Sequence, residues 1–250
     1  MKLVLLFLLT ISSLFANEYY AKANPFEKFL IKSDVSGKVV FSDEFKEGKN
    51  SDGKIVIKID DYIDSIELNT TKSEILNLEE NILITKKLYE IDKKAYEKIK
   101  KLSTYSRTQK DKKLTKMLSS KANLLNQKTT LSKLKLKLAS LKDKINKKNI
   151  KVDEKYYIYK VYPKVGDFVN FGSPLLEIAD LSKARLTIFV TLEDLKKIKT
   201  SKILIDEKDI KYKIIKTVKV ADTQNISTYK VELSIPAPLI FSKLVKVEIK

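Results

Sequence analysis

The sequence predicts an α+β protein in which two groups of short strands flank a long antiparallel helical hairpin, with a further β-domain after them. Three observations predict this fold class. Residues 72–147 contain neither Gly nor Pro and repeat apolar residues at helical spacing, with one polar break. On both sides of this segment, apolar residues alternate with polar ones around glycine turns. Another series of short strands follows in residues 184–250.

The first group of strands is predicted in residues 33–71. Apolar residues recur at even spacing in two runs, which are Val35, Val39 and Phe41, and then Ile55, Ile57 and Ile59. Glu47-Gly48 and Asp52-Gly53 are turn signals between the runs. Residues 17–32, which precede these strands, form an N-terminal segment that is assigned to no domain.

The first helix of the hairpin is predicted to begin at Thr71. Thr71 and Glu74 have the spacing of a capping box, with Thr71 at the N-cap and Glu74 at the N3 position. In a capping box, each of the two side chains accepts a hydrogen bond from the backbone N–H of the other residue. From there to Leu102 there is an apolar stripe at helical spacing. Its members are Ile84, Leu88, Ile91, Ala95 and Leu102.

The second helix is predicted from about Asp111 to Lys147 and has a heptad register typical of a coiled coil. The predicted seam consists of Met117, Leu124, Leu131, Leu134, Leu138, Leu141 and Ile145. A polar turn separates the helices, so they form an antiparallel hairpin with arms of roughly 45–55 Å. Ordinary packing in a helical bundle is the alternative; strands on both sides of only two helices favour a projecting hairpin.

Strands resume after the hairpin. Tyr157, Tyr159 and Val161 alternate within residues 148–183, and Gly166 and Gly172 mark turns. In residues 184–250 we expect a strand at 186–190, a short helix at 192–199, and strands at 203–205, 210–220, 228–235 and 244–249.

Composition excludes several classes of function. The net charge is +18, and all but two of the 50 basic residues are Lys. Arg is the residue that reads phosphate and guanine through paired hydrogen bonds, so this lysine surplus is typical of a solvated basic surface, and we expect no nucleic-acid partner. His and Cys are absent. That absence excludes thiol nucleophiles, histidine bases and nearly all zinc and copper sites. We therefore expect that the chain is not an enzyme and that it has neither catalytic residues nor a metal site.

Residues 1–16 are predicted to be a cleaved signal peptide that directs export. A single Lys precedes a mainly apolar run that ends at Ala16, and a run of about 14 residues is too short to span a bilayer comfortably. A short uncleaved anchor is the alternative. We expect the mature protein to carry no lipid anchor, because such an anchor needs a Cys.

The strand groups on either side of the hairpin resemble each other. Gly48 and Gly53 precede an apolar strand that ends at Ile59-Asp60. Gly166 and Gly172 likewise precede a strand that ends near Ile178. Each half is too small to bury its apolar face alone, so the two halves are expected to close on each other around the inserted hairpin. Coincidence among β-turns is the alternative.

The order of these parts resembles the hemolysin-D-like membrane fusion proteins, over nearly the whole chain. The most specific stretch is 165–180, which reads VGDFVNFGSPLLEIAD and is similar to the second lipoyl half of that family. Residues 181–186 and 190–198 resemble the entry to its β-barrel, and Ser36-Gly37-Lys38-Val39 fits the first half. Two positions depart from the pattern: Thr200-Ser201 stands where a Gly is frequent, and Asp111 stands where a tip Leu occurs in some members.

The resemblance implies a split lipoyl-like (barrel-sandwich hybrid) β-domain, residues 33–71 and 148–183, with the coiled-coil hairpin 72–147 inserted and a small β-barrel domain at 184–250. It implies a periplasmic adaptor that links an inner-membrane transporter, proton-driven or ATP-driven, to an outer-membrane channel for export of small molecules or other substrates. It also implies a ring-shaped homo-oligomer peripheral to the inner membrane. In true lipoyl domains, the Lys that carries the cofactor stands on a tight turn between the two halves. Here the hairpin is inserted at that place, so we expect no cofactor.

The hairpin tip is the candidate partner-binding site. It comprises Ser103, Thr104, Tyr105, Ser106, Arg107, Thr108, Gln109 and Lys110. A solvated turn without a partner is the alternative. Two other patterns are interpreted as structural: the acidic residues 60–67 as a polar connector rather than a cation site, and Ser132 with Lys135 as helix surface rather than a nucleophile pair. The alternative function is a periplasmic coiled-coil structural or adhesion protein without a transporter.

Overall fold

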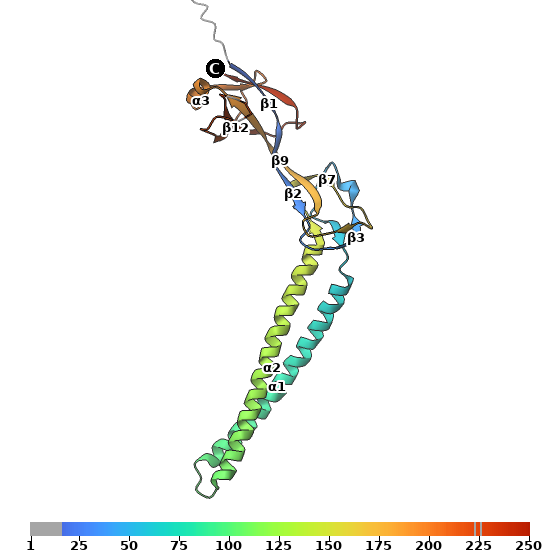
Figure 1. The fold of residues 1–250 in the computed structure, drawn as a ribbon, viewed down its shortest axis with the longest axis vertical. Coiled ribbons are helices and arrows are strands. Elements are labelled where there is room, and N and C mark those ends of the chain that lie inside the picture. Colours follow the sequence, from blue (N-terminus) through green and yellow to red (C-terminus); the bar gives the residue numbers. More distant parts are fainter. Residues whose placement is uncertain (1–16, 223, 226) are drawn as a thin grey trace, which may run out of the picture.

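The computed structural model describes residues 17–222, 224–225 and 227–250, so the predicted signal peptide lies outside the described residues. Three parts follow one another along an elongated molecule: a β-barrel domain at one end, a smaller β-domain in the middle, and a helical hairpin that projects from it (Figure 1). The predicted fold class, two β-regions with an inserted antiparallel hairpin, is confirmed. No helix among the described residues is both long and apolar enough to cross a membrane.

The middle β-domain is built from strands on both sides of the hairpin. Its strands are β3 (Gly37–Ser42), β4 (Lys49–Asn50), β5 (Ile55–Ile59), β6 (Asn149–Lys151), β7 (Tyr156–Val161), β8 (Phe168–Val169) and the first part of β9 (Pro174–Val190); a 3-10 turn, η1, spans Glu44–Lys46. Every strand that precedes the hairpin pairs with one that follows it: β3 with β8, β5 with β6, and β4 with β7. The two halves therefore fold as one unit.

The core of this domain explains why neither half can stand alone. Val39, Ile57 and Ile59 from the first half are fully buried, and they pack in one cluster with Ile158 and Leu176 from the second. Burying a side chain of this size stabilises a fold by about 1.5–3 kcal/mol relative to leaving it exposed. Most of that gain is lost when the partner half is absent.

The glycine turns that suggested a repeat share one backbone property. Gly48, Gly53, Gly166 and Gly172 all have positive φ, between 73° and 102°. Only glycine adopts this region without a steric penalty, so both halves need glycine at their turns. At Gly53 a Cβ atom would also lie 3.3 Å from the Glu154 side chain.

The barrel domain includes strands from both ends of the chain, which the sequence interpretation missed. β1 (Asn17–Lys22) pairs with β13 (Leu244–Ile249), and β13 pairs with β10 (Ile203–Ile205). Residues 17–32, predicted to lie outside any domain, are thus two strands, β1 and β2 (Asn24–Lys32). The signal was weak because the buried positions of this segment are the small residues Ala21 and Ala23, rather than large apolar ones.

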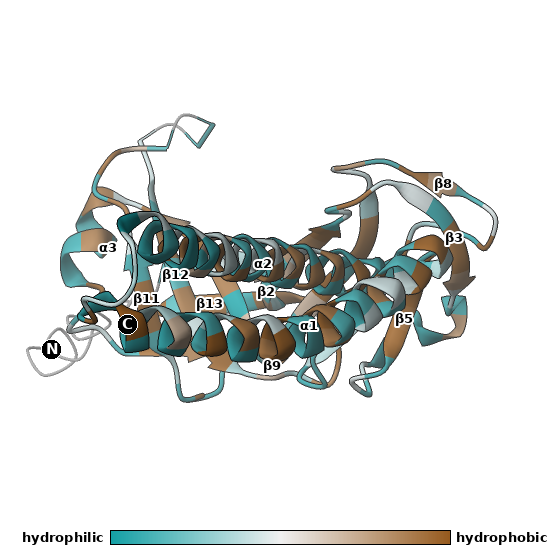
Figure 2. Ribbon diagram, turned by 90° about the horizontal axis from the view of Figure 1, so that it is seen from below, coloured by the Kyte–Doolittle hydropathy of each residue, from teal (hydrophilic) through white to brown (hydrophobic). Residues whose placement is uncertain are grey.

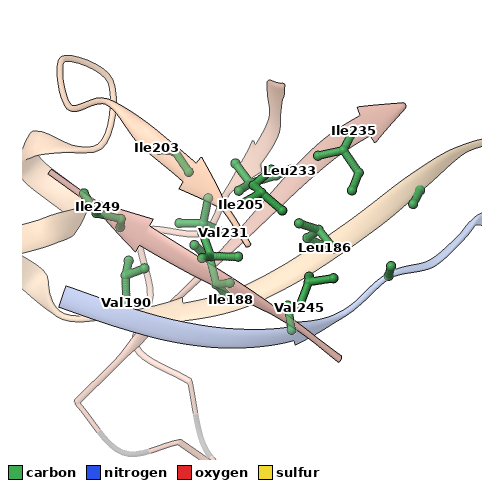
Figure 3. Close-up of a cluster of buried hydrophobic side chains, with 14 of the residues drawn as sticks. Leu186, Ile188, Val190, Ile203, Ile205, Val231, Leu233, Ile235, Val245 and Ile249 are labelled. Atoms are coloured by element: carbon green, nitrogen blue, oxygen red, sulfur yellow. The ribbon is translucent and has the colours of Figure 1, made fainter. Parts of the chain in front are cut away.

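The rest of the barrel matches the predicted strands. β11 (Lys213–Thr217) and β12 (Tyr229–Pro236) pair with each other, and β12 pairs with the second part of β9. The short helix α3 (Leu192–Lys197) begins at the N-cap Thr191. Leu186, Ile188, Ile205, Val231 and Leu233 lie in the barrel core (Figure 3), and each is at most 1% exposed.

A two-stranded ribbon joins the two β-domains. β9 runs for 17 residues through both, and β2 pairs with it from Asn24 to Lys32 (Figure 1). The pairing slips opposite Phe26, where the Arg185 guanidinium lies 5.1 Å from the ring centre. The domains are therefore connected by hydrogen-bonded strands rather than by a single loop.

The hairpin consists of α1 (Tyr62–Lys100) and α2 (Arg107–Lys148), each about 60 Å long at the standard helical rise. The predicted start at residues 71–72 is wrong, because α1 begins ten residues earlier. Its N-terminus is held by Asp60, whose carboxylate accepts a hydrogen bond of 3.0 Å from the Tyr62 amide. Thr71 is 1% exposed and lies inside the hairpin, so the Thr71–Glu74 spacing does not mark a cap.

The hairpin leaves and re-enters the middle domain through neighbouring strands, which makes its removal testable. Lys58 of β5 lies opposite Asn149 of β6. Replacing residues 62–148 with four Gly/Ser residues turns β5 and β6 into an ordinary β-hairpin. We expect the remaining chain to unfold in one cooperative thermal transition with unchanged β-type circular dichroism. A broad, non-cooperative melt would show that the middle domain depends on the helices.

Candidate functional site

The face of α1 that packs against α2 differs from the predicted stripe. Buried or half-buried positions recur along α1 at alternating steps of three and four, as the heptad pattern requires. They are Asp64, Leu68, Thr71, Ile75, Leu78, Ile82, Thr85, Tyr89, Asp92, Tyr96 and Ile99. Of the predicted stripe, Ala95 is half-buried, whereas Ile84, Leu88, Ile91 and Leu102 are 46–63% exposed. The apolar residues Ile84, Leu88, Ile91 and Leu102 therefore do not form the buried face that packs against α2.

The predicted seam residues of α2 all lie at its protected positions. Leu124 and Leu141 are each 7% exposed, and Met117, Leu131, Leu134, Leu138 and Ile145 are half-buried. Half-burial is expected where a single partner helix covers only one side. Continuing the same heptad places Ser120, Gln127 and Lys148 toward α1 as well.

Two buried aspartates form polar layers in this seam. Near the tip, the carboxylate of Asp92 accepts a hydrogen bond of 2.5 Å from Ser120 Oγ, and Lys116 Nζ lies 3.3 Å away. The hydrogen bond from the Ser120 hydroxyl is the main reason that the pKa of Asp92 lies below its usual value. At the base, Lys148 Nζ contacts the Asp64 carboxylate and donates to the Asp60 carbonyl at 2.6 Å.

The base layer holds Asp64 ionised. Partial burial opposes ionisation, but hydrogen bonds from Lys144 and Lys148 outweigh it, so the pKa of Asp64 lies below its usual value. Lys144 Nζ is 2.8 Å from the second carboxylate oxygen. The Asp64 and Lys148 side chains are only 6% and 10% exposed, so this pair fixes the helices at the point where they leave the β-domain.

The tip is divided between the turn and the start of α2. Residues 103–106 lie in the turn, and residues 107–110 form the first turn of the helix. Ser106 and Gln109 make a reciprocal capping box: Gln109 N donates to Ser106 Oγ at 3.3 Å, and Ser106 N donates to Gln109 Oε1 at 2.9 Å. These two side chains therefore shape the turn, and the sequence interpretation did not recognise their capping role.

The remaining tip side chains project into solvent. Residues 103–109 are exposed, and Lys110 is half-buried. The Arg107 side chain is 96% exposed, and Asp111 lies 3.9 Å from its Nε. An exposed ion pair at this distance holds the guanidinium only weakly, which leaves its donors available to another molecule.

An open groove of about 960 Å³ lies between the helices beside the tip. Leu88, Ile99 and Tyr105 supply apolar wall, and Lys112, Lys113 and Lys116 line it with positive charge. The small residues Ser119 and Ser120 line it on the α2 side. Sequence reasoning missed it, because its walls come from two helices whose relative register was not known.

The two patterns interpreted as structural are engaged within the chain. Asp61 pairs with Lys58 at 3.1 Å and Glu67 with Lys137 at 2.7 Å. Lys135 pairs with Glu79 at 2.7 Å, and Ser132 Oγ donates to the Lys128 carbonyl. Among residues 17–222, 224–225 and 227–250, no group of acidic side chains has the arrangement of a metal site.

Comparison with solved structures identifies the fold. MacA from Actinobacillus actinomycetemcomitans matches 94% of this chain over 78% of its own, with a TM-score of 0.74 and 16% identity. A MacA-MexA chimera that contains the Pseudomonas aeruginosa MexA α-hairpin domain matches 94% over 80%, with a TM-score of 0.59 and 16% identity. The membrane fusion protein Spr0693 from Streptococcus pneumoniae R6 matches 94% over 98%, with a TM-score of 0.58 and 11% identity.

No protein-family model matches the sequence, and no curated protein matches it. The chain nevertheless has the fold of the membrane fusion proteins, which confirms the predicted resemblance at the level of the fold.

Proposed function

We propose that this chain is an exported periplasmic adaptor that joins an inner-membrane transporter to an outer-membrane channel, and that it works as a ring of identical copies. The observation that carries the proposal is the hairpin itself. It holds a capped polar tip about 60 Å from the β-domains, on a fold shared with membrane fusion proteins. The role is non-catalytic, and the transporter supplies the energy for export.

The tip is the proposed contact with the channel. Its side chains are small and polar except for Tyr105 and two basic groups, and the capping box fixes the turn before any partner arrives. A preordered turn loses less conformational entropy on binding than a flexible one. The exposed Arg107 guanidinium can donate paired hydrogen bonds to a carboxylate or to backbone carbonyls on the channel.

Arg107→Asp tests this contact. We expect it to reduce cross-linking between the tip and the outer-membrane channel by about tenfold or more, the scale of one lost charge-assisted hydrogen bond. Helicity and melting temperature should stay unchanged, because the side chain is exposed. The measurement uses a photo-cross-linking residue at Thr104 in the native cells, followed by identification of the attached protein.

Lys133→Asp is the matched control. It makes the same change of charge at an exposed position on α2, about 39 Å from Arg107. We expect normal cross-linking from this variant. If Arg107→Asp also cross-links normally, the tip contact is elsewhere; if no variant attaches to an outer-membrane protein, the adaptor role gives way to the structural or adhesion protein.

A further inference from the structure

The groove beside the tip joins an apolar wall to charged side chains. Its wall consists of Leu88 and Ile99 from α1 and Tyr105 from the turn, and Leu88 and Tyr105 are 47% and 40% exposed. Hydrophobic residues accordingly interrupt the hydrophilic surface of α1 in Figure 2. Apolar surface that stays open to solvent inside a hollow is typical of a site for a small ligand.

The charged side chains of the groove leave a surplus of positive charge. Three lysines and one aspartate line it, so its net charge is +2. Lys116 Nζ lies 3.3 Å from the Asp92 carboxylate, which also accepts a hydrogen bond from Ser120. Lys112 and Lys113 are exposed and make no ion pair within the described part of the chain. Their ammonium groups can therefore bind an anion without giving up an acidic partner.

The size of the groove suits a small elongated molecule. Its volume of about 960 Å³ lies within the range of about 300–1,000 Å³ that is usual for small-molecule sites. Leu88 and Ile99 are eleven residues apart on one helix, which gives the wall a length of about 16 Å. A partner helix of that length, with its side chains, occupies about 1,300–1,800 Å³ and is too large to enter in full.

We propose that this groove binds an amphipathic monoanion, an elongated molecule with one carboxylate and an apolar chain of about ten carbons. An extended chain advances about 1.2 Å per bond, so ten carbons cover about 11 Å of the wall and leave room for the carboxylate. The chain packs along Leu88 and Ile99, and Lys112 and Lys113 donate hydrogen bonds to the carboxylate. The proposal does not depend on the adaptor function.

Three ligands that differ only in the charge of the head group test this site. Decanoate, decan-1-ol and decyltrimethylammonium are titrated into the full chain, purified from its native cells, in a calorimeter. We expect decanoate to bind saturably with one molecule per chain. Decan-1-ol should bind about tenfold more weakly or worse, the scale of one lost charge-assisted hydrogen bond, and the cation should not bind. Equal affinity for decanoate and decan-1-ol, or no binding of decanoate, would overturn the proposal.

Paired lysine variants show whether the groove or the general positive charge of the chain attracts the ligand. Lys112→Ala combined with Lys113→Ala should weaken decanoate binding about tenfold or more and remove the preference over decan-1-ol. Lys128→Ala combined with Lys133→Ala is the matched control, because it removes the same charge from exposed positions of α2 outside the groove. We expect the control to bind decanoate within about twofold of wild type. An equal loss in both double variants would mean that no specific site exists.

Filling the groove tests its place without changing any charge. Ser119→Trp should abolish binding of decanoate and leave helicity unchanged, because Ser119 lines the groove and is exposed. Ser132→Trp, on the exposed surface of α2 outside the groove, should bind decanoate normally. Normal binding by Ser119→Trp would overturn the proposal. So would attachment of a single protein to a photo-cross-linking residue at Thr115 in the native cells, undiminished by decanoate, because it would assign the groove to a protein partner.

Discussion

Leu124→Asp should unfold the tip half of the hairpin while both β-domains stay folded. Leu124 is 7% exposed against α1, and a carboxylate there would lose its hydration without gaining a partner. The combined loss of apolar packing and cost of a buried charge is several kcal/mol, about 3–5. Far-UV circular dichroism should show reduced helicity, and amide hydrogen exchange should rise in α1 and α2 but not in the strands.

Leu136→Asp is the matched control for this change. It makes the same substitution on the same helix, twelve residues away, where the side chain is 73% exposed. We expect its melting temperature to shift by no more than about 2 °C, as is usual for surface substitutions. Equal loss of helicity in both variants would mean that the heptad seam does not hold the hairpin together.

The two helices differ in how far the sequence predicts their packing. The α2 seam could be predicted because leucines occupy its inward positions, so that hydrophobicity and register agree. In α1, hydrophobicity and register disagree. Asp64, Thr71, Thr85 and Asp92 occupy inward positions and are each at most 8% exposed. A search for apolar residues passes over such polar positions, and their partners on α2 are known only from the three-dimensional pairing.

In the β-domains, too, the sequence predicts local features better than non-local pairing. Glycines stand at the turns, where φ is positive, so the split domain could be predicted from Gly48, Gly53, Gly166 and Gly172. β1 could not, because its place in the barrel depends on pairing with β13, more than two hundred residues later. Non-local pairing of this kind leaves no periodic trace when the buried residues are alanines.

At the candidate site, the sequence predicted the polar tip but not its construction. Eight polar residues between two apolar repeats are enough to indicate a turn. The capping box of Ser106 and Gln109 moves the start of α2 to Arg107, four residues before the predicted start. The groove beside the tip depends on which residues of α1 and α2 stand level with one another, and hence on the register that apolar spacing misjudged.

Asp64→Asn should destabilise the hairpin at its base by about 3 kcal/mol, the lower end of the range for a broken buried pair. It leaves the Lys148 ammonium, 10% exposed, with the Asp60 carbonyl but without its carboxylate. Replacing both partners, as Asp64→Asn with Lys148→Met, should recover most of the loss, because no buried charge remains. Thermal melts of the full chain measure the stability of the single and of the double variant.

Asp143→Asn is the control, because it breaks the exposed pair with Lys147. It should change stability by less than about 0.5 kcal/mol.

The Asp64→Asn variant has a predicted pH dependence. The folded-state pKa of Asp64 is depressed, so its contribution to stability is fully present above the unfolded Asp pKa of about 3.9 and is lost as pH falls through the folded-state pKa. The gap in melting temperature between wild type and Asp64→Asn should therefore be constant from about pH 5 to 7 and narrow below about pH 4. Asn cannot ionise, so the narrowing must come from protonation of the wild-type carboxyl. A gap that stays constant down to pH 2.5 would mean that the lost hydrogen-bond geometry, rather than the charge of Asp64, accounts for the destabilisation.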